Sequence, residues 1–148
     1  MNLTAISAIL DGAERDGRDV LLETEGLRLL AALGLPAPAF SFVTCAADVD
    51  ADLLSRLPGA KAVVKVISPR ILHKSDVGGV AIVEKAVDAV AAAVARMDGA
   101  LGPQGVVGYT ISECIPYSPA LGREWLVGLR WTEDVGPVVT VGAGGIYT

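Results

Sequence analysis

Two short runs of β-branched residues, joined by a polar loop, constrain the fold of this chain most. The runs are 62–67, AVVKVI, and 80–84, VAIVE. Because valine and isoleucine suit a pleated surface and both lengths are typical of strands, each run is predicted to be a β-strand. The loop 68–79 begins with Ser68-Pro69, which ends regular pairing, and finishes with Gly78-Gly79, where the backbone can turn.

Cations and the only histidine of the sequence gather around this loop. Phosphate oxygens need positive charge and backbone N–H groups at close range, and glycine lets the backbone approach them. The segment is therefore predicted to bind phosphate through Lys65, Arg70, Lys74, Gly78 and Gly79. It is not a P-loop, since GxxxxGK[ST] does not occur in the sequence.

Simpler interpretations of the same residues stay open at this point. A lysine inside a strand often protects the edge of a sheet, so Lys65 has a structural alternative. A lone histidine is more often a structural hydrogen-bonding group than a catalyst, which applies to His73.

The rest of the chain alternates helical and strand patterns, which predicts one α/β (α+β) domain. Helices are predicted over 4–15 (capped by Thr4), 23–33, 46–57 and 86–97, and further strands over 40–44, 106–115, 124–131 and 137–141. The last of these helices places Val87, Val90, Ala91, Val94 and Met97 on one stripe, so it should face the core.

Composition limits the class of function. The 148 residues are 52% apolar and 20% charged, which is typical of a globular domain. The net charge of −5 without a Lys/Arg cluster argues against nucleic acid or an anionic membrane as partner. Cys45 and Cys114 lack metal-site spacing, and the N-terminal stretch lacks the pattern of a signal peptide, so a cytoplasmic protein with reduced thiols is expected.

Several motifs together resemble a known family. SPRILHKSDVGG, preceded by VVKV and followed later by GPVVTVGAGGIYT, is similar to the ATP-grasp domain or subunit of the NDP-forming acyl-CoA synthetases. This group includes ADP-forming acetate-CoA ligase and is related to succinyl-CoA synthetase. LLETEGLRLLAALGLPAPAF also resembles the family's opening helix and the proline-containing segment that follows it, so the resemblance covers nearly the whole chain.

The resemblance implies an ATP-grasp fold with a particular division of the chain. Residues 1–115 would form the first subdomain, with the phosphate loop at 68–79. Residues 116–148 would form the hinge, at 116–122, and the truncated start of the second subdomain.

The same resemblance implies a nucleotide site. Lys65 is similar to the lysine that touches the nucleotide phosphates, and Glu113 with the backbone of Ile115 resembles the hinge that meets the adenine edge. Glu124 would face the ribose hydroxyls, although the residue pattern alone favours solvated carboxylates for Glu113 and Glu124. The implied cofactors are ATP or ADP and Mg²⁺, whose ligands are expected beyond residue 148, so no metal ligand is assigned here.

For His73 the resemblance implies catalysis. In the family a histidine on the CoA-binding partner carries phosphate, and the histidine of the HKSD loop is a second carrier in some members. An imidazole can hold phosphate as a labile phosphoamidate, and Arg70 and Lys74 would neutralise the transferred group. The implied reaction is acyl-CoA + ADP + phosphate ⇌ acid + ATP + CoA, with the 148 residues inactive alone.

Two other classes of function remain as alternatives. One is a nucleotide-sensing regulatory module of a synthetase-like protein fused to a protein acetyltransferase, and the presence of Lys65 and His73 favours the enzyme over it. The other is an assembly surface for the CoA-binding subunit, anchored by Trp125 and Trp131.

Overall fold

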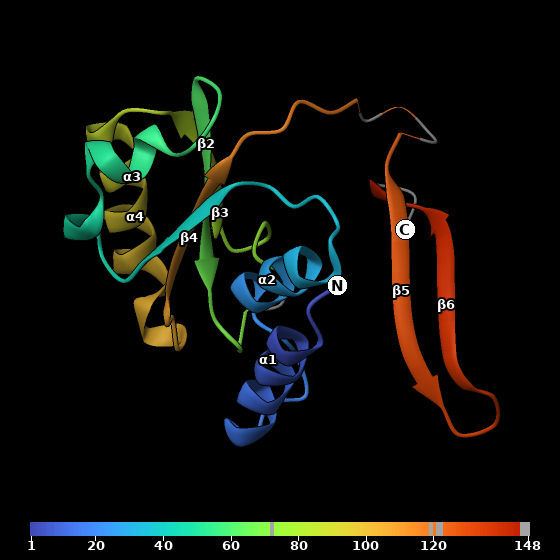
Figure 1. Cartoon of the computed structure of the whole chain (residues 1–148). Helices are drawn as coiled ribbons and strands as arrows, with labels where there is room; N and C mark the ends of the chain where they lie inside the picture. Colours follow the sequence, from blue (N-terminus) through green and yellow to red (C-terminus); the bar gives the residue numbers. More distant parts are fainter. Residues whose placement is uncertain (72, 119, 121–122, 146–148) are drawn as a thin grey trace. The chain divides into compact units, whose positions relative to one another are not determined.

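The computed structural model describes residues 1–71, 73–118, 120 and 123–145, and the chain divides into two compact units. The first unit, Met1–Cys114, contains helices and strands, and the second, Ile115–Thr148, contains a hairpin of two strands (Figure 1). The helices are α1 (Leu3–Arg15), α2 (Glu23–Leu33), α3 (Ala51–Ser55) and α4 (Val87–Leu101). The strands are β1 (Phe40–Val43), β2 (Lys61–Ile67), β3 (Val80–Glu84), β4 (Gly108–Glu113), β5 (Trp125–Thr132) and β6 (Gly136–Ala143). The mixed α/β class is confirmed.

The first unit is built on an antiparallel sheet with the strand order β1-β4-β2-β3. Since β2 lies between β4 and β3, Lys65 is not on an edge strand, and the interpretation as an edge lysine is wrong. Lys65 pairs with Val80 on one side and Thr110 on the other. Successive side chains of a strand point to opposite faces, so Lys65 faces away from its neighbours Val64 and Val66.

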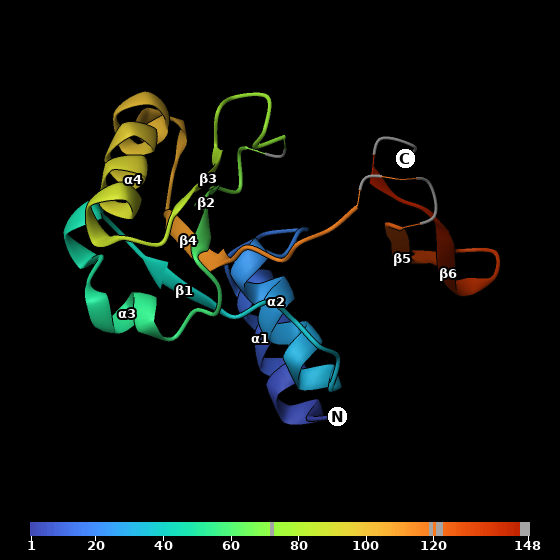
Figure 2. The same ribbon diagram turned by 90° about the horizontal axis from the view of Figure 1, so that it is seen from above.

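One face of the sheet carries the hydrophobic core. Helices α3 and α4 lie on this side, and the pair α1–α2 lies on the other (Figures 1 and 2). The buried side chains of α4 meet those of β2 and β4, and none of the following is more than 4% exposed: Ala62, Val64, Val66, Val90, Ala93, Val94, Met97, Leu101, Tyr109 and Ile111. The predicted stripe on α4 is therefore confirmed, with Ala93 and Leu101 added to it. Burial of this apolar surface is what holds α4 on the sheet.

A half-buried arginine fixes the start of α2 in the pair α1–α2. The guanidinium of Arg18 donates to both carboxylate oxygens of Glu25, at 2.7 Å and 2.6 Å. Glu25 also accepts a hydrogen bond from Leu22 N at 2.7 Å, which stabilises the start of α2. Gly34 ends α2 in the left-handed conformation, at φ 82°. The first helix is capped by Asn2, whose side chain accepts from Ala5 N, so the prediction of Thr4 as the cap is wrong.

The helix predicted over 46–57 is interrupted. A 3₁₀ turn at Ala46–Asp48 is followed by extended backbone at Val49 and then by α3. The carboxylate of Asp48 accepts from Thr44 N and Cys45 N, and that of Asp50 accepts from Leu53 N at 2.7 Å. Two acids two residues apart thus cap two separate short helices, which breaks the one that apolar spacing predicts.

In the second unit β5 and β6 pair from Trp125 opposite Ala143 to Thr132 opposite Gly136. Strand β5 has the predicted length and is displaced by one residue, and β6 is longer than predicted. Of the hinge predicted at 116–122, residues 119 and 121–122 lie outside the described part of the chain, as do residue 72 of the loop and 146–148 of the last motif. No helix among the described residues is long and apolar enough to cross a membrane.

Candidate functional site

The loop 68–79 folds back onto the strand that it leaves. Ser68 Oγ accepts from Arg70 N and donates to Gln104 O, both at 3.1 Å, which holds the start of the loop. Near its end Gly79 N donates to Lys74 O at 2.7 Å, and Gly79 O accepts from Val66 N at 2.9 Å. The loop is therefore held at its start to Gln104 and at its end to β2, and Lys74 is fixed close to that strand.

The two glycines of the loop serve different purposes. Gly78 has φ 72°, a left-handed conformation that favours glycine, and so makes the turn into β3. Gly79 is needed for close approach, since a Cβ there would lie 2.5 Å from Val66 Cγ1 and 3.0 Å from Lys74 O. The shape of the loop alone therefore explains why glycine stands at both positions.

A carboxylate that the sequence reading missed lies between the two lysines. Glu23 Oε1 accepts from Lys65 Nζ at 2.7 Å, and Glu23 Oε2 accepts from Lys74 Nζ at 2.5 Å. We call these three residues the charge cluster. Their side chains are 21%, 33% and 20% exposed, respectively, so the cluster is half-buried. The cluster joins the first residue of α2 to β2 and to the loop. It contains two positive charges and one negative charge.

The environment of Glu23 favours its charged form. Burial alone would raise the pKa of this carboxyl, but hydrogen bonds and charges from Lys65 and Lys74 outweigh burial and hold its pKa below the ordinary value. The position at the start of a helix also suits a negative charge. The cluster is therefore a fully charged arrangement at neutral pH.

The charge cluster borders a polar hollow of about 500 Å³. Its lining consists of Glu23, Lys65, His73, Lys74, Ser75, Asp76 and Val80. The structure therefore brings Lys65, His73 and Lys74 together around one space. His73 is exposed, so its imidazole is accessible to a ligand.

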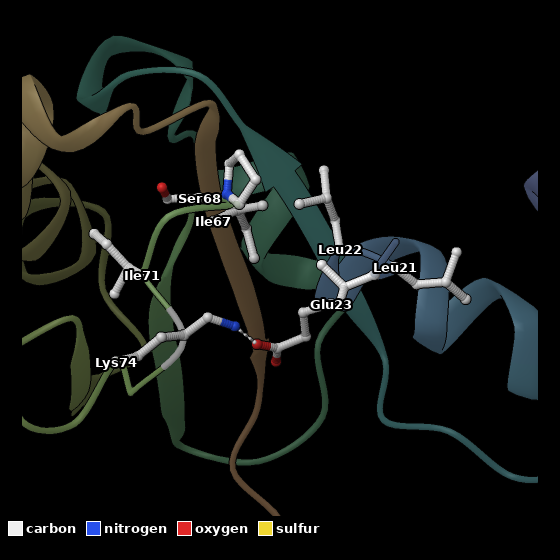
Figure 3. A pocket seen from close by; sticks show the side chains of 9 residues that line it. Leu21, Leu22, Glu23, Ile67, Ser68, Ile71 and Lys74 are labelled. Atoms are coloured by element: carbon white, nitrogen blue, oxygen red, sulfur yellow. Dashed lines mark hydrogen bonds and ion pairs between the residues drawn. The ribbon is translucent and has the colours of Figure 1, made fainter. Parts of the chain in front are cut away.

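Two further hollows adjoin the first. One of about 260 Å³ shares Glu23 and Lys74 with it and is otherwise lined mostly by apolar side chains, including Leu21, Leu22 and Ile71 (Figure 3). In Figure 3 the side chains of Glu23 and Lys74 point toward one another at its border. The other, of about 370 Å³, is lined by Arg70 and His73 among others. Arg70 thus adjoins His73 but does not line the hollow of the lysines.

Glu113 has a partner within the first unit. Its carboxylate accepts from Ala39 N at 2.8 Å, while its own N–H donates to Ala39 O at 2.9 Å. This carboxylate fastens the segment that leads into β1 to the end of β4, so it is not simply solvated. Ile115, the first residue of the second unit, is 52% exposed.

Glu124 belongs to the second unit and lies against a glycine. A Cβ on Gly145, whose φ is 69°, would come within 2.5 Å of Glu124 Oε1. The backbone oxygen of Glu124 accepts from Gly144 N at 3.0 Å. The pair of glycines after β6 therefore lets the chain pass close to this carboxylate.

Among the described residues, no group of three or more His, Cys, Asp or Glu side chains could hold a metal ion. The nearest acid to the lysines, Glu23, has both oxygens engaged by ammonium groups. These residues therefore do not offer the oxygen-ligand set that Mg²⁺ prefers.

Comparison with known proteins adds independent information. The family model described as ATP-grasp domain matches residues 12–148. The 4-hydroxybutyrate–CoA ligase [ADP-forming] of Nitrosopumilus maritimus is 31% identical over an alignment 151 residues long, which covers 99% of this chain and 21% of the relative. The subunit beta of acetate–CoA ligase [ADP-forming] I of Pyrococcus furiosus is 32% identical over 143 residues, covering 94% of this chain and 59% of the subunit.

A solved structure is similar over almost the whole chain. It is the dinucleotide forming acetyl-coenzyme A synthetase 1 of Ca. Korarchaeum cryptofilum in complex with coenzyme A, Ca-AMPCP and HgCl+. The TM-score is 0.80 at 26% identity, and the match covers 94% of this chain and 60% of that one. The chain thus spans only part of the length of each of these proteins.

Proposed function

Because this chain belongs to the ATP-grasp domain family, we propose that it is the nucleotide-binding part of an ADP-forming acid–CoA ligase. The observation that carries the proposal is the convergence of Lys65, Lys74 and His73 on one hollow. Two cations suit phosphate groups, and an accessible imidazole beside them suits phosphoryl transfer. The related ADP-forming ligases of Nitrosopumilus maritimus and Pyrococcus furiosus support the reaction class.

The proposed reaction is acyl-CoA + ADP + phosphate ⇌ acid + ATP + CoA. In the direction that consumes ATP, an imidazole nitrogen of His73 attacks the terminal phosphorus, a P–N bond forms, and the P–O bond to ADP breaks. In the opposite direction the phosphoryl group passes from His73 to ADP. Lys65 and Lys74 neutralise the phosphate oxygens during both transfers.

The remaining roles belong to the same proposal. Arg70 adjoins His73 on its other side and would contact phosphate only when that group is carried by the imidazole. Glu113 and the backbone of Ile115 are proposed to meet the adenine edge, and Glu124 is proposed to face the ribose. Residues 1–115 would form the first subdomain, and residues 116–148 the hinge and the start of the second. Gly78 and Gly79 keep the loop in the shape that presents Lys74.

A metal ion and a partner complete the proposed enzyme. Mg²⁺ bound with the nucleotide would neutralise phosphate charge, and since the described residues offer no suitable group, its ligands are proposed to come from elsewhere in the protein. The partner is a CoA-binding domain or subunit with its own carrier histidine. Cytoplasmic location and inactivity of the 148 residues alone stay predictions.

A regulatory module fused to a protein acetyltransferase gains no support from these comparisons. The related proteins named above are ligases or ligase subunits, and none is described as an acetyltransferase. The accessible His73 beside two lysines is also unnecessary for a protein that only senses nucleotide.

The test is His73→Asn in the full-length protein, assembled with its CoA-binding partner. Asparagine keeps a polar group but cannot form the phosphoamidate. We expect ADP binding to change little and ligase turnover to be lost, with acid-labile ³²P label from ATP absent from the ATP-grasp part. Val77→Ala, a change at an exposed loop residue without a polar group, should leave label and turnover intact. Normal turnover of His73→Asn would show that His73 is a structural residue.

A further inference from the structure

The charge cluster already holds an anion where the proposed function requires a phosphate. Glu23 offers one oxygen to Lys65 and the other to Lys74, at 2.7 Å and 2.5 Å. An ammonium group binds a phosphate oxygen at about 2.7–2.9 Å, through the same N–H donors that Glu23 engages. The carboxylate thus takes up the donors that a phosphoryl group in the same hollow would use.

Glu23 and a phosphate cannot share these lysines without cost. Both are anions, and a half-buried site screens their repulsion less than water does. With Glu23 in place the cluster has a net charge of +1, whereas without it two cations face the hollow. A bound phosphate is therefore most stable when the carboxylate has moved away.

The structure provides a place for the displaced carboxylate. Glu23 lines both the hollow of the lysines and the adjoining hollow of about 260 Å³ (Figure 3). Rotation about the side-chain bonds of Glu23 would carry the carboxylate toward the second hollow while α2 stays where it is.

We infer that Glu23 is a specificity-determining residue of the phosphate pocket, one that occupies the phosphate position when the pocket is empty and is displaced when phosphate binds. This inference rests on the proposed function, because it takes phosphate as the ligand of the hollow. Glu23 keeps the two lysines paired, and so keeps the loop attached to α2, until a ligand with more charge replaces it. A singly charged anion has no advantage over the carboxylate, so the cluster selects for polyphosphates.

The test compares Glu23→Gln with the full-length wild-type protein by calorimetry, with inorganic tripolyphosphate, ADP and adenosine as ligands. Removal of one competing charge should tighten binding of tripolyphosphate and ADP roughly tenfold, and leave adenosine unchanged. Glu23→Ala should give the same increase at a helix position that tolerates alanine. Glu84→Gln is the control, since it changes the net charge equally at a carboxylate that is 71% exposed.

Two failures can be told apart. If tripolyphosphate and ADP bind the wild type and Lys65→Ala weakens them while Lys61→Ala does not, the phosphate pocket is real; unchanged or weaker binding by both Glu23 variants then overturns this inference alone. Lys61 is a suitable control because it lies on the same strand and is 58% exposed. If neither the wild type nor any variant binds these ligands, the proposed function and the inference both fail.

Discussion

Glu23 connects the stability of the first unit to pH. Its lysine partners hold its pKa below the ordinary value of 4.5, although burial opposes them. A carboxyl with a lowered folded pKa contributes stability that is present above the unfolded pKa and is lost as pH falls through the folded pKa. The contribution of the charge cluster is therefore complete at neutral pH and disappears progressively below about pH 4.5.

Glu23→Gln should lower the free energy of unfolding at pH 7 by about 1–2 kcal/mol, because two half-buried ammonium groups lose their anion. The difference from the wild type should shrink as the pH is lowered below 4.5, since the unfolded wild-type chain then takes up a proton at this carboxyl before the folded protein does. Urea unfolding at pH 7 and pH 4, followed by circular dichroism, measures both effects. A variant as stable as the wild type at pH 7 would contradict this expectation.

The site could be predicted from the sequence only where its residues are neighbours in the chain. Lys65, His73 and Lys74 fall within one short segment, and their residue types point to phosphate there. Glu23 lies 42 residues from Lys65 and 51 from Lys74. Its role depends on where α2 packs, and an acid in the first turn of a helix is too common to indicate that place.

At the scale of elements, the close approach of the loop to β2 depends on Gly79. A Cβ at this position would meet the buried Val66 and the backbone oxygen of Lys74, neither of which can move freely. Gly79→Ala should therefore destabilise the protein by about 1–3 kcal/mol and weaken tripolyphosphate binding, because Lys74 shifts with the loop.

Gly99→Ala provides the matched control. Gly99 lies in α4, and a Cβ there would meet no atom within 4 Å. Alanine should stabilise the helix by roughly 0.5–1 kcal/mol. Thermal unfolding of both variants measures the two stability changes. If Gly79→Ala is as stable as the wild type, the loop can accommodate a Cβ at this position, contrary to the prediction.

Helices with strong end signals could be predicted closely, and those with competing signals could not. The bounds of α2 follow from its apolar spacing and from Gly34. The interruption before α3 was not predictable from periodicity, because it depends on which backbone N–H groups the carboxylates of Asp48 and Asp50 reach. The order of the strands required the structure, since periodicity identifies strands but not their neighbours.

At the scale of the whole molecule, both tryptophans of the sequence lie in the second unit, while the hydrophobic core lies in the first. Trp125 and Trp131 are 70% and 75% exposed. Tryptophan emission of the 148-residue chain should therefore be typical of solvated indole and should change little through the transition that removes the helical circular dichroism.

The comparison of the two spectroscopic signals during thermal unfolding checks this prediction. Phe42→Trp, which places an indole on β1 of the first unit, should by contrast report the transition seen by circular dichroism. A large change of wild-type emission in parallel with the loss of helix would mean that the tryptophans are packed against other parts of the chain.

The position of β4 has a consequence for biosynthesis. This strand is the last of its sheet to leave the ribosome, yet it lies between β1 and β2. Until residues 108–113 have emerged, β1 has no strand beside it, and the core lacks Tyr109 and Ile111. Until then the nascent chain carries exposed apolar surface and an unpaired strand, the condition in which a chaperone is most useful.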